Sequence, residues 1–188
     1  MQLDLKTVPA GRPRRNEKNA IVYWLLPAKP ERELFCEIVR ILRKEFRAPN
    51  FEPHVTLFST AKDRQPPNKV LKQISLRPIR LTASGVAFSS AFTRTLFVRL
   101  KSSPLLRKLV TDLGRAAKSP AKAPSDPHVS LLYKKLPRAT KKELAAVMKL
   151  PFRTVVFDSI AAVRCVSPSR TAADVESWRI LGKKSLPR

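Results

Sequence analysis

The chain is predicted to adopt an α+β fold, because segments with strand character and segments with helix character alternate along its 188 residues. Apolar, β-branched stretches bounded by proline indicate buried strands, and apolar residues at helical spacing indicate amphipathic helices. The predicted order is strand, helix, strand, helix and two strands, followed by helix, strand, helix and two strands. Because the second half repeats the organisation of the first, we expect two lobes within one globule.

In the first half, the apolar run AIVYWLL predicts a buried strand, and a proline in the first turn favours the helix that follows it. The predicted elements are strand Ala20–Leu26, helix Glu31–Arg47, strand Glu52–Ser59, a short helix after Pro66 and Pro67, and strands near Arg77–Phe88 and Arg94–Leu100. In the short helix, Val70, Leu71 and Ile74 are expected to face inward.

In the second half, Ser103 is expected to cap a helix with a buried stripe of Leu105, Leu109 and Leu113. Thr140 and Glu143 have the spacing of a capping box. The elements predicted after the helix that Ser103 caps are a loop at Lys118–Pro127, strand Pro127–Tyr133, a helix from Thr140 to about Leu150, and strands Phe152–Val166 and Val175–Leu181.

The charge of the chain is strongly positive, with 38 Lys and Arg against 14 Asp and Glu, a net charge of +24. Such a field concentrates phosphates and nucleic acids, although solubility alone also accounts for it. Hydrophobic residues make up 43% of the chain, enough for a core. Cys36 and Cys165 form no CxxC motif and are interpreted as buried thiols in a reducing compartment.

No segment near the start of the chain has the features of a membrane anchor or a signal peptide. The apolar run Ala20–Ala28 is too short to span a bilayer, and the residues before it lack an apolar core. We therefore expect a cytoplasmic protein with no membrane partner. Residues 1–19 are expected to form a disordered basic lead, and residues 20–188 a single domain.

Both histidines of the chain occur in matching motifs, His54 in PHVTL and His128 in PHVSL. Side chains two residues apart on a strand point to the same face. His54 and Thr56 should therefore project together, as should His128 and Ser130, while their apolar neighbours face the core. Two such strands facing across a cleft would bring two imidazoles and two hydroxyls to one small anion.

This set of side chains suits the hydrolysis of a phosphodiester. One neutral histidine can take a proton from the attacking water, and the other, protonated, can give a proton to the leaving oxygen. The hydroxyls can donate hydrogen bonds to the phosphoryl oxygens. The profile of activity against pH should then be bell-shaped, because one histidine must be neutral while the other is protonated. Phosphate-binding glycine loops and metal-site motifs are absent from the sequence, so no cofactor and no metal are expected. Asp126 is interpreted as a turn residue, with orientation of His128 as the alternative.

These motifs resemble those of the 2H phosphoesterase superfamily, and within it the cyclic phosphodiesterases of plants and yeast. The resemblance covers roughly residues 20–182 and is carried by IVYWLLP, FEPHVTL, PHVSLLY and the late ESW. It implies two lobes related by a pseudo-twofold axis, each with an antiparallel sheet and helices, and an active-site cleft between them. It also implies metal-independent opening of nucleoside 2′,3′-cyclic phosphates or ADP-ribose 1″,2″-cyclic phosphate to a phosphomonoester.

On the family pattern, His54, Thr56, His128 and Ser130 are the catalytic residues, and three aromatic residues lie near the base or ribose. These are Trp24, Phe92 and Tyr133, although strand alternation alone would point Tyr133 away from His128. We expect a monomer whose partner is a small cyclic-phosphate nucleotide. The charge of +24 is a departure from the family and leaves RNA ends open as substrates. The alternatives are an RNA-end cyclic phosphodiesterase or 2′-5′ RNA ligase-like enzyme, and a non-catalytic RNA-binding protein.

Overall fold

The strands of the computed structural model are close to those predicted from the sequence, and they confirm the α+β class. The structure describes residues 18–60, 65–75 and 77–187, so most of the predicted basic lead lies outside the described residues. The strands are β1 (Lys18–Pro27), β2 (Val55–Thr60), β3 (Ile79–Phe88), β4 (Leu96–Leu100), β5 (His128–Leu132), β6 (Thr154–Ser167) and β7 (Arg179–Ser185). The helices are α1 (Glu31–Phe46), α2 (Pro67–Gln73), α3 (Pro104–Ala116), α4 (Arg138–Val147) and α5 (Ala172–Glu176), with a 3₁₀ turn η1 at Phe92–Arg94.

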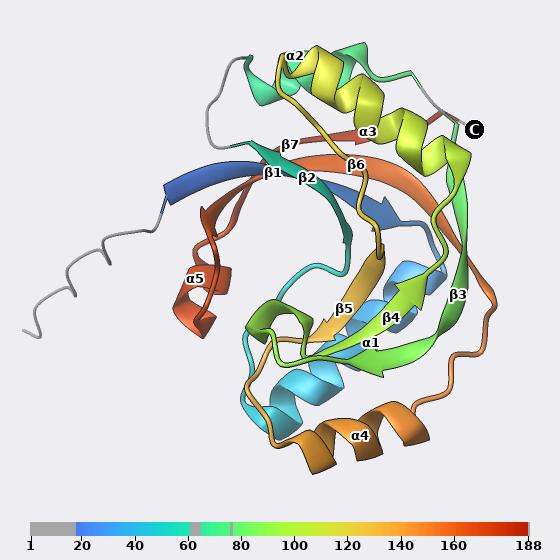
Figure 1. Cartoon of the computed structure of the whole chain (residues 1–188), viewed down its shortest axis with the longest axis vertical. Helices are drawn as coiled ribbons and strands as arrows, with labels where there is room; N and C mark the ends of the chain where they lie inside the picture. Colours follow the sequence, from blue (N-terminus) through green and yellow to red (C-terminus); the bar gives the residue numbers. More distant parts are fainter. Residues whose placement is uncertain (1–17, 61–64, 76, 188) are drawn as a thin grey trace, which may run out of the picture.

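The seven strands form one antiparallel sheet in the order β2-β1-β6-β3-β4-β5, with β7 paired to β6 (Figure 1). The two strands at the ends of this path, β2 and β5, are the two that carry the histidine motifs. They also contact each other, because the sheet curls back on itself. The curl therefore places the two motifs side by side. The division into two pseudo-symmetric lobes stays a prediction.

The change of direction in the sheet occurs within β3. The first part of this strand pairs with β6 and the last part with β4, and the pairing shifts register between Ala83 and Val86. Gly85 lies inside this shift with a φ of 109°, a conformation that side chains with a Cβ rarely adopt. This glycine thus permits the bend that carries β4 and β5 back over the rest of the sheet.

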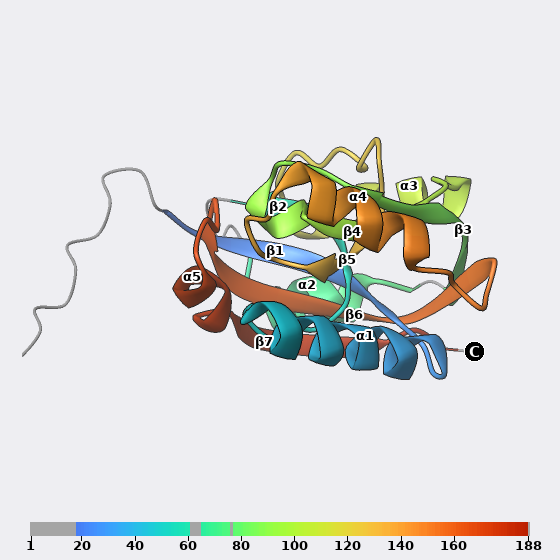
Figure 2. The same cartoon turned by 90° about the horizontal axis from the view of Figure 1, so that it is seen from below.

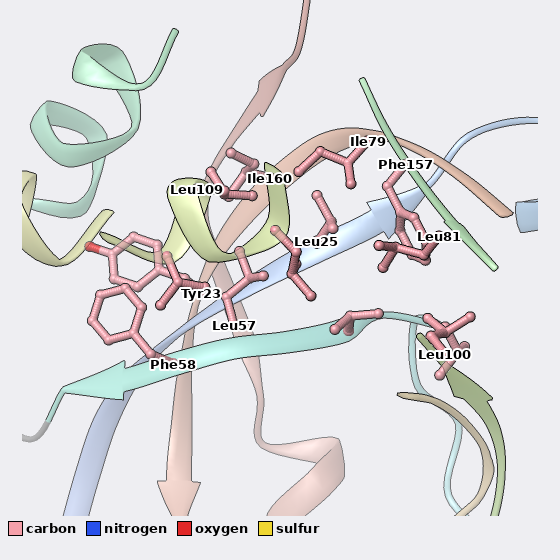
Figure 3. Packing of buried hydrophobic residues seen from close by; sticks show 14 of the residues in the cluster. Tyr23, Leu25, Leu57, Phe58, Ile79, Leu81, Leu100, Leu109, Phe157 and Ile160 are labelled. Atoms are coloured by element: carbon pink, nitrogen blue, oxygen red, sulfur yellow. The ribbon is translucent and has the colours of Figure 1, made fainter. Parts of the chain in front are cut away.

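The core lies inside the curl and beneath the helices. Tyr23 of β1 stacks on Phe58 of β2 at 5.0 Å, and Leu25, Leu57 and Ile160 pack nearby (Figure 3). The apolar residues between the motif positions are buried, as the strand alternation predicted: Val55, Leu57, Val129 and Leu131.

The helices cover opposite sides of the curled sheet. Helices α2 and α3 lie beyond β6 and β7, whereas α1 and α4 lie on the other side, against β5 and against β3 and β4 respectively (Figures 1 and 2). The buried positions Val70, Leu71 and Ile74 confirm the inward face predicted for α2. None of the helices among the described residues is long and apolar enough to pass through a bilayer.

Several local predictions were wrong in detail. Leu105 is 50% exposed, and the buried stripe of α3 is completed by Leu106 instead, although Ser103 does cap the helix. Helix α4 begins at Arg138 with no side-chain cap, so Thr140 forms no capping box. The capping box lies at Thr171 and Asp174, where it opens α5, and the last two residues of this helix, Val175 and Glu176, were predicted to begin a strand. Cys165 is buried, but Cys36 is only half-buried.

Candidate active site

The four motif residues meet at one cleft of about 400 Å³. Thr56 and Ser130 lie on β2 and β5, His128 is the first residue of β5, and His54 immediately precedes β2. His54 therefore lies outside the strand in which it was predicted, yet its side chain still lines the cleft together with Thr56. The central spatial prediction, that the two distant imidazoles share one pocket, is confirmed.

Each histidine is oriented by the backbone carbonyl two residues before it. The Nδ1 of His54 lies 2.6 Å from the oxygen of Glu52, and the Nδ1 of His128 lies 2.9 Å from the oxygen of Asp126. Because a carbonyl oxygen can only accept, Nδ1 must carry the proton in both rings. The neutral tautomer of each histidine therefore has its lone pair on Nε2, and this nitrogen is left for proton transfer.

Burial makes both histidines weaker bases than free imidazole. It lowers the pKa of His54 to about 4, against the bond to Glu52, which raises it. The nearby His128 lowers this pKa further. The pKa of His128 is also lowered, mainly by burial and in addition by the positive charge of Arg94. Both rings are therefore neutral near pH 7, and His128, which is half-buried, is the easier of the two to protonate.

Aromatic rings form one wall of the cleft. Trp24 stacks on the ring of His54 at 3.7 Å with an interplanar angle of 10°. Trp178 meets the Trp24 ring edge-on at 5.3 Å, and Tyr133 stacks on Phe51 at 3.8 Å. Trp24, Tyr133 and Trp178 line the cleft.

The predicted aromatic residues behave differently from one another. Tyr133 lines the cleft: it lies one residue beyond the end of β5, so the strand alternation that would point it away from His128 does not apply to it. Phe92 packs against the Tyr133 ring, 6.3 Å between centroids, and is not one of the described residues that line the cleft.

The two motif hydroxyls also differ. The Thr56 side chain is exposed in the cleft. The Ser130 hydroxyl is buried, donates to the carbonyl of Thr93 at 3.0 Å, and hydrogen-bonds the Tyr133 hydroxyl. Burial raises the pKa of Tyr133, so the phenol stays protonated. Thr56 is therefore free to approach a ligand, whereas Ser130 must first release a backbone carbonyl.

Arg94 supplies positive charge to the cleft and was missed by the sequence reasoning. Among the described residues that line the cleft, it is the one lysine or arginine. Its guanidinium is ion-paired with the carboxylate of Asp126 and lies 4.2 Å above the ring of Phe97. Its Nε is buried without a hydrogen-bond partner among the described residues.

Asp126 was interpreted as a turn residue, with orientation of His128 as the alternative, and the structure shows that it does orient His128. Its backbone carbonyl orients His128, while its carboxylate holds Arg94 and lies 3.4 Å from the Nε of Arg99. In a chain with 38 basic residues, no pattern in the sequence distinguishes Arg94 from its neighbours. Trp178, by contrast, could have been found, since it lies in the late ESW segment that carries part of the family resemblance.

Comparison with known proteins assigns the family. The family model of the 2′-5′ RNA ligase superfamily matches residues 32–165, most of the chain and both motifs. The chain belongs to this superfamily. The resemblance to 2H phosphoesterases predicted from the sequence is thereby confirmed.

The chain is similar to known proteins in sequence and in fold. The cyclic phosphodiesterase of Arabidopsis thaliana is 26% identical over 129 residues, which cover 67% of this chain and 71% of that protein. E. coli LigT in its apo form matches with a TM-score of 0.53 and 18% identity, over 92% of this chain and 100% of LigT. A protein of Thermus thermophilus matches with a TM-score of 0.54 and 20% identity, over 89% of this chain and 97% of that protein. At these identities the structural matches show the fold.

Proposed function

We propose that this superfamily member hydrolyses a cyclic phosphodiester to a phosphomonoester without a metal, using His54 and His128 as base and acid. The supporting observation is that each ring has its Nδ1 bonded to a backbone carbonyl, so that both Nε2 atoms are left to serve the shared cleft. The substrates in this proposal are nucleoside 2′,3′-cyclic phosphates and ADP-ribose 1″,2″-cyclic phosphate. The cyclic phosphodiesterase of Arabidopsis thaliana supports the reaction class.

The difference in burial supports a separate role for each histidine in this proposal. His54 is buried and has the lower pKa, about 4, so it is neutral across the physiological range and suits the base. His128 is more exposed, and a bound phosphate anion favours its protonated form, so it suits the acid. His54 removes a proton from water as the water oxygen bonds to phosphorus. His128 gives its proton to the ribose oxygen as the ring P–O bond breaks.

The remaining residues of the cleft bind the substrate in this proposal. The guanidinium of Arg94 and the hydroxyl of Thr56 contact the non-bridging phosphoryl oxygens, where charge increases in the transition state. Ser130 joins them by turning its hydroxyl away from the Thr93 carbonyl. Trp24, Tyr133 and Trp178 provide apolar faces for the ribose and base. Phe92 acts on the substrate only through Tyr133.

The proposal is tested by hydrolysis assays in the presence of a chelator, with 2′,3′-cyclic nucleotides and ADP-ribose cyclic phosphate as substrates. The His54→Ala and His128→Ala variants should each lose about 10²–10⁴-fold in kcat, the usual contribution of acid–base catalysis. Lys69→Ala, on the exposed surface of α2, is the control and should keep full activity. A wild-type protein that binds these nucleotides but turns none of them over would favour the non-catalytic alternative.

A further inference from the structure

A second basic concavity lies at the C-terminal end of α1, apart from the cleft. We call it the α1 groove: it is lined by Arg40, Arg43, Lys44, Arg47 and Ala48 and encloses about 400 Å³. Arg47 ends the helix in the left-handed conformation, with a φ of 47°, and the chain then turns back so that the N–H of Ala48 bonds to the carbonyl of Arg43 at 3.1 Å. The four cationic side chains are all exposed.

The charges of the α1 groove are poorly compensated within the protein. Arg40 is ion-paired with Glu37, but none of the ion pairs among the described residues involves Arg43, Lys44 or Arg47. Arg40 and Lys44, and likewise Arg43 and Arg47, are four residues apart on the helix, a spacing at which like charges repel. The negative end of the helix dipole offsets part of this repulsion. A concave surface with three uncompensated cations nevertheless favours an anionic ligand.

The α1 groove is connected to the cleft through the end of β5. Tyr133 lines the cleft, and the next residue, Lys134, donates its Nζ to the carbonyl of Arg47 at 3.4 Å. The backbone of Lys134 is held in turn by the hydroxyl of Thr95, 2.6 Å from the Lys134 carbonyl. Helix α1 itself contacts β5. Lys134 therefore links Tyr133, which lines the cleft, to Arg47, which lines the groove.

We propose that the α1 groove is a second phosphate site, which holds the backbone of a single-stranded oligoribonucleotide whose cyclic-phosphate end lies in the cleft. This inference rests on the proposed function, since that function places the terminal phosphate between the two histidines. A mononucleotide bound in the cleft carries no further phosphate to fill the groove, whereas an oligonucleotide does. Arginine is suited to this role because its guanidinium bonds phosphate oxygens in pairs. The 2′,3′-cyclic phosphate requires ribose, which selects RNA over DNA.

The test compares a groove variant with a control variant of equal charge. The groove variant is Arg43→Ala, Lys44→Ala and Arg47→Ala; the control is Lys69→Ala, Lys101→Ala and Arg107→Ala. The control residues are exposed, and two of them lie on α2 and α3, across the molecule from α1 (Figure 1). The probe is a fluorescent single-stranded oligoribonucleotide of about ten nucleotides with a 3′-terminal phosphate, which binds without turnover. Its affinity is measured as a function of salt, and hydrolysis is measured on a cyclic mononucleotide and on a cyclic-phosphate-ended oligonucleotide.

For the groove variant we expect the Kd for the probe to rise at least tenfold. The slope of log K against log salt should become shallower by about 2, since each phosphate contact to a single strand contributes about 0.7. The kcat/KM for the cyclic mononucleotide should stay within twofold of wild type, while that for the oligonucleotide falls. The control variant should change the Kd less than threefold. If the triple variant does not fold, Arg43→Gln alone should show the same selective loss to a smaller extent.

Three results would overturn the inference: equal weakening of the probe by both variants, an unchanged Kd in the groove variant, and competition by polyglutamate as strong as by RNA of equal charge. The last would assign the groove to an acidic protein. Failure of the proposed function is distinguishable, because probe binding needs no turnover. If the wild type hydrolyses none of the substrates but the groove variant binds the probe more weakly than the wild type, the groove remains a phosphate site and the proposed reaction is refuted.

Discussion

The charge on Arg94 and the protonation of His128 are coupled through Asp126. The Asp126 carboxylate holds the guanidinium, and its carbonyl holds the imidazole, so one residue positions both groups on the same side of the cleft. The ring of Phe97 contacts both groups, with its centroid 4.2 Å from the Cζ of Arg94 and 5.1 Å from the imidazole centroid. In the proposed mechanism, Arg94 binds the phosphate and also lowers the pKa of His128, which makes His128 a stronger general acid.

Replacing Arg94 with glutamine should therefore change the pH profile as well as the rate. The positive charge of Arg94 lowers the pKa of His128, so its removal raises that pKa and keeps the acid protonated at higher pH. We expect the alkaline limb of kcat/KM to move upward, and kcat/KM at its optimum to fall at least tenfold because a phosphate contact is lost. Lys108→Gln, on the exposed face of α3, is the control. A fall in rate with an unshifted limb would show that Arg94 acts on binding alone.

The buried imidazole of His54 should make stability depend on pH. Its pKa is about 4 in the folded chain and about 6.5 when unfolded, so the unfolded state binds more protons below pH 6.5. Stability is therefore complete above about pH 6.5 and falls as the pH drops toward 4, by up to about 3 kcal/mol from this group. Urea unfolding at several pH values should show a flatter dependence for His54→Gln than for wild type. Parallel curves would contradict this assignment.

At the scale of elements, the bend in β3 decides whether the two motifs meet. The strands that carry them are far apart along the sheet, and they contact each other only because the sheet curls. Gly85, with its φ of 109°, lies where β3 changes partners from β6 to β4. The geometry of the cleft thus depends on a residue that does not line it.

Substituting Gly85 with alanine should be costly although the space around it is open. No atom lies within 4 Å of the position that a Cβ would occupy, so any cost comes from the backbone conformation. A non-glycine residue in a sparsely populated conformation of this kind costs about 1–3 kcal/mol. Thermal and urea unfolding would measure this loss, and Ser84→Ala, one residue earlier, should cost less than about 1 kcal/mol. Equal stability of Gly85→Ala and wild type would show that the bend needs no glycine.

The elements were easier to predict from the sequence than the site was. Amphipathic periodicity identified α1, and the strands that carry the motifs follow from their apolar alternation. The short helix α5 was missed because five residues give no periodicity, and Val175 was taken for part of a strand. Convergence of His54 and His128 could be predicted from matched motifs. The presence of Arg94 and the withdrawal of the Ser130 hydroxyl could not, because both depend on long-range contacts to Asp126 and Thr93.

At the scale of the whole molecule, a net charge of +24 acts on folding as well as on ligands. The basic residues repel one another in the compact state, and the ion pairs among the described residues compensate only part of that charge. Most of these pairs include at least one exposed side chain, and such pairs contribute little to stability.

Salt should therefore stabilise this protein. Raising the ionic strength from about 0.01 M to about 0.15 M shortens the screening length from about 30 Å to about 8 Å, which weakens the repulsion between distant charges. We expect the Tm to rise by several degrees over this range in scanning calorimetry. An oligonucleotide at low salt should raise the Tm as well, since it binds the folded state and neutralises it. A Tm that falls with salt would show that attractive pairs dominate.

The ring cluster around His54 also equips the molecule for direct optical study. The chain has two tryptophans, and both lie on the wall of the cleft, with their centroids 3.7 Å and 6.1 Å from that of His54. Intrinsic indole emission therefore originates entirely at the cleft, where a neighbouring imidazolium quenches it more than a neutral ring does. Titration with acid, or with an unlabelled nucleotide, can then be followed by fluorescence alone. Replacing each indole by phenylalanine in turn would separate the two signals.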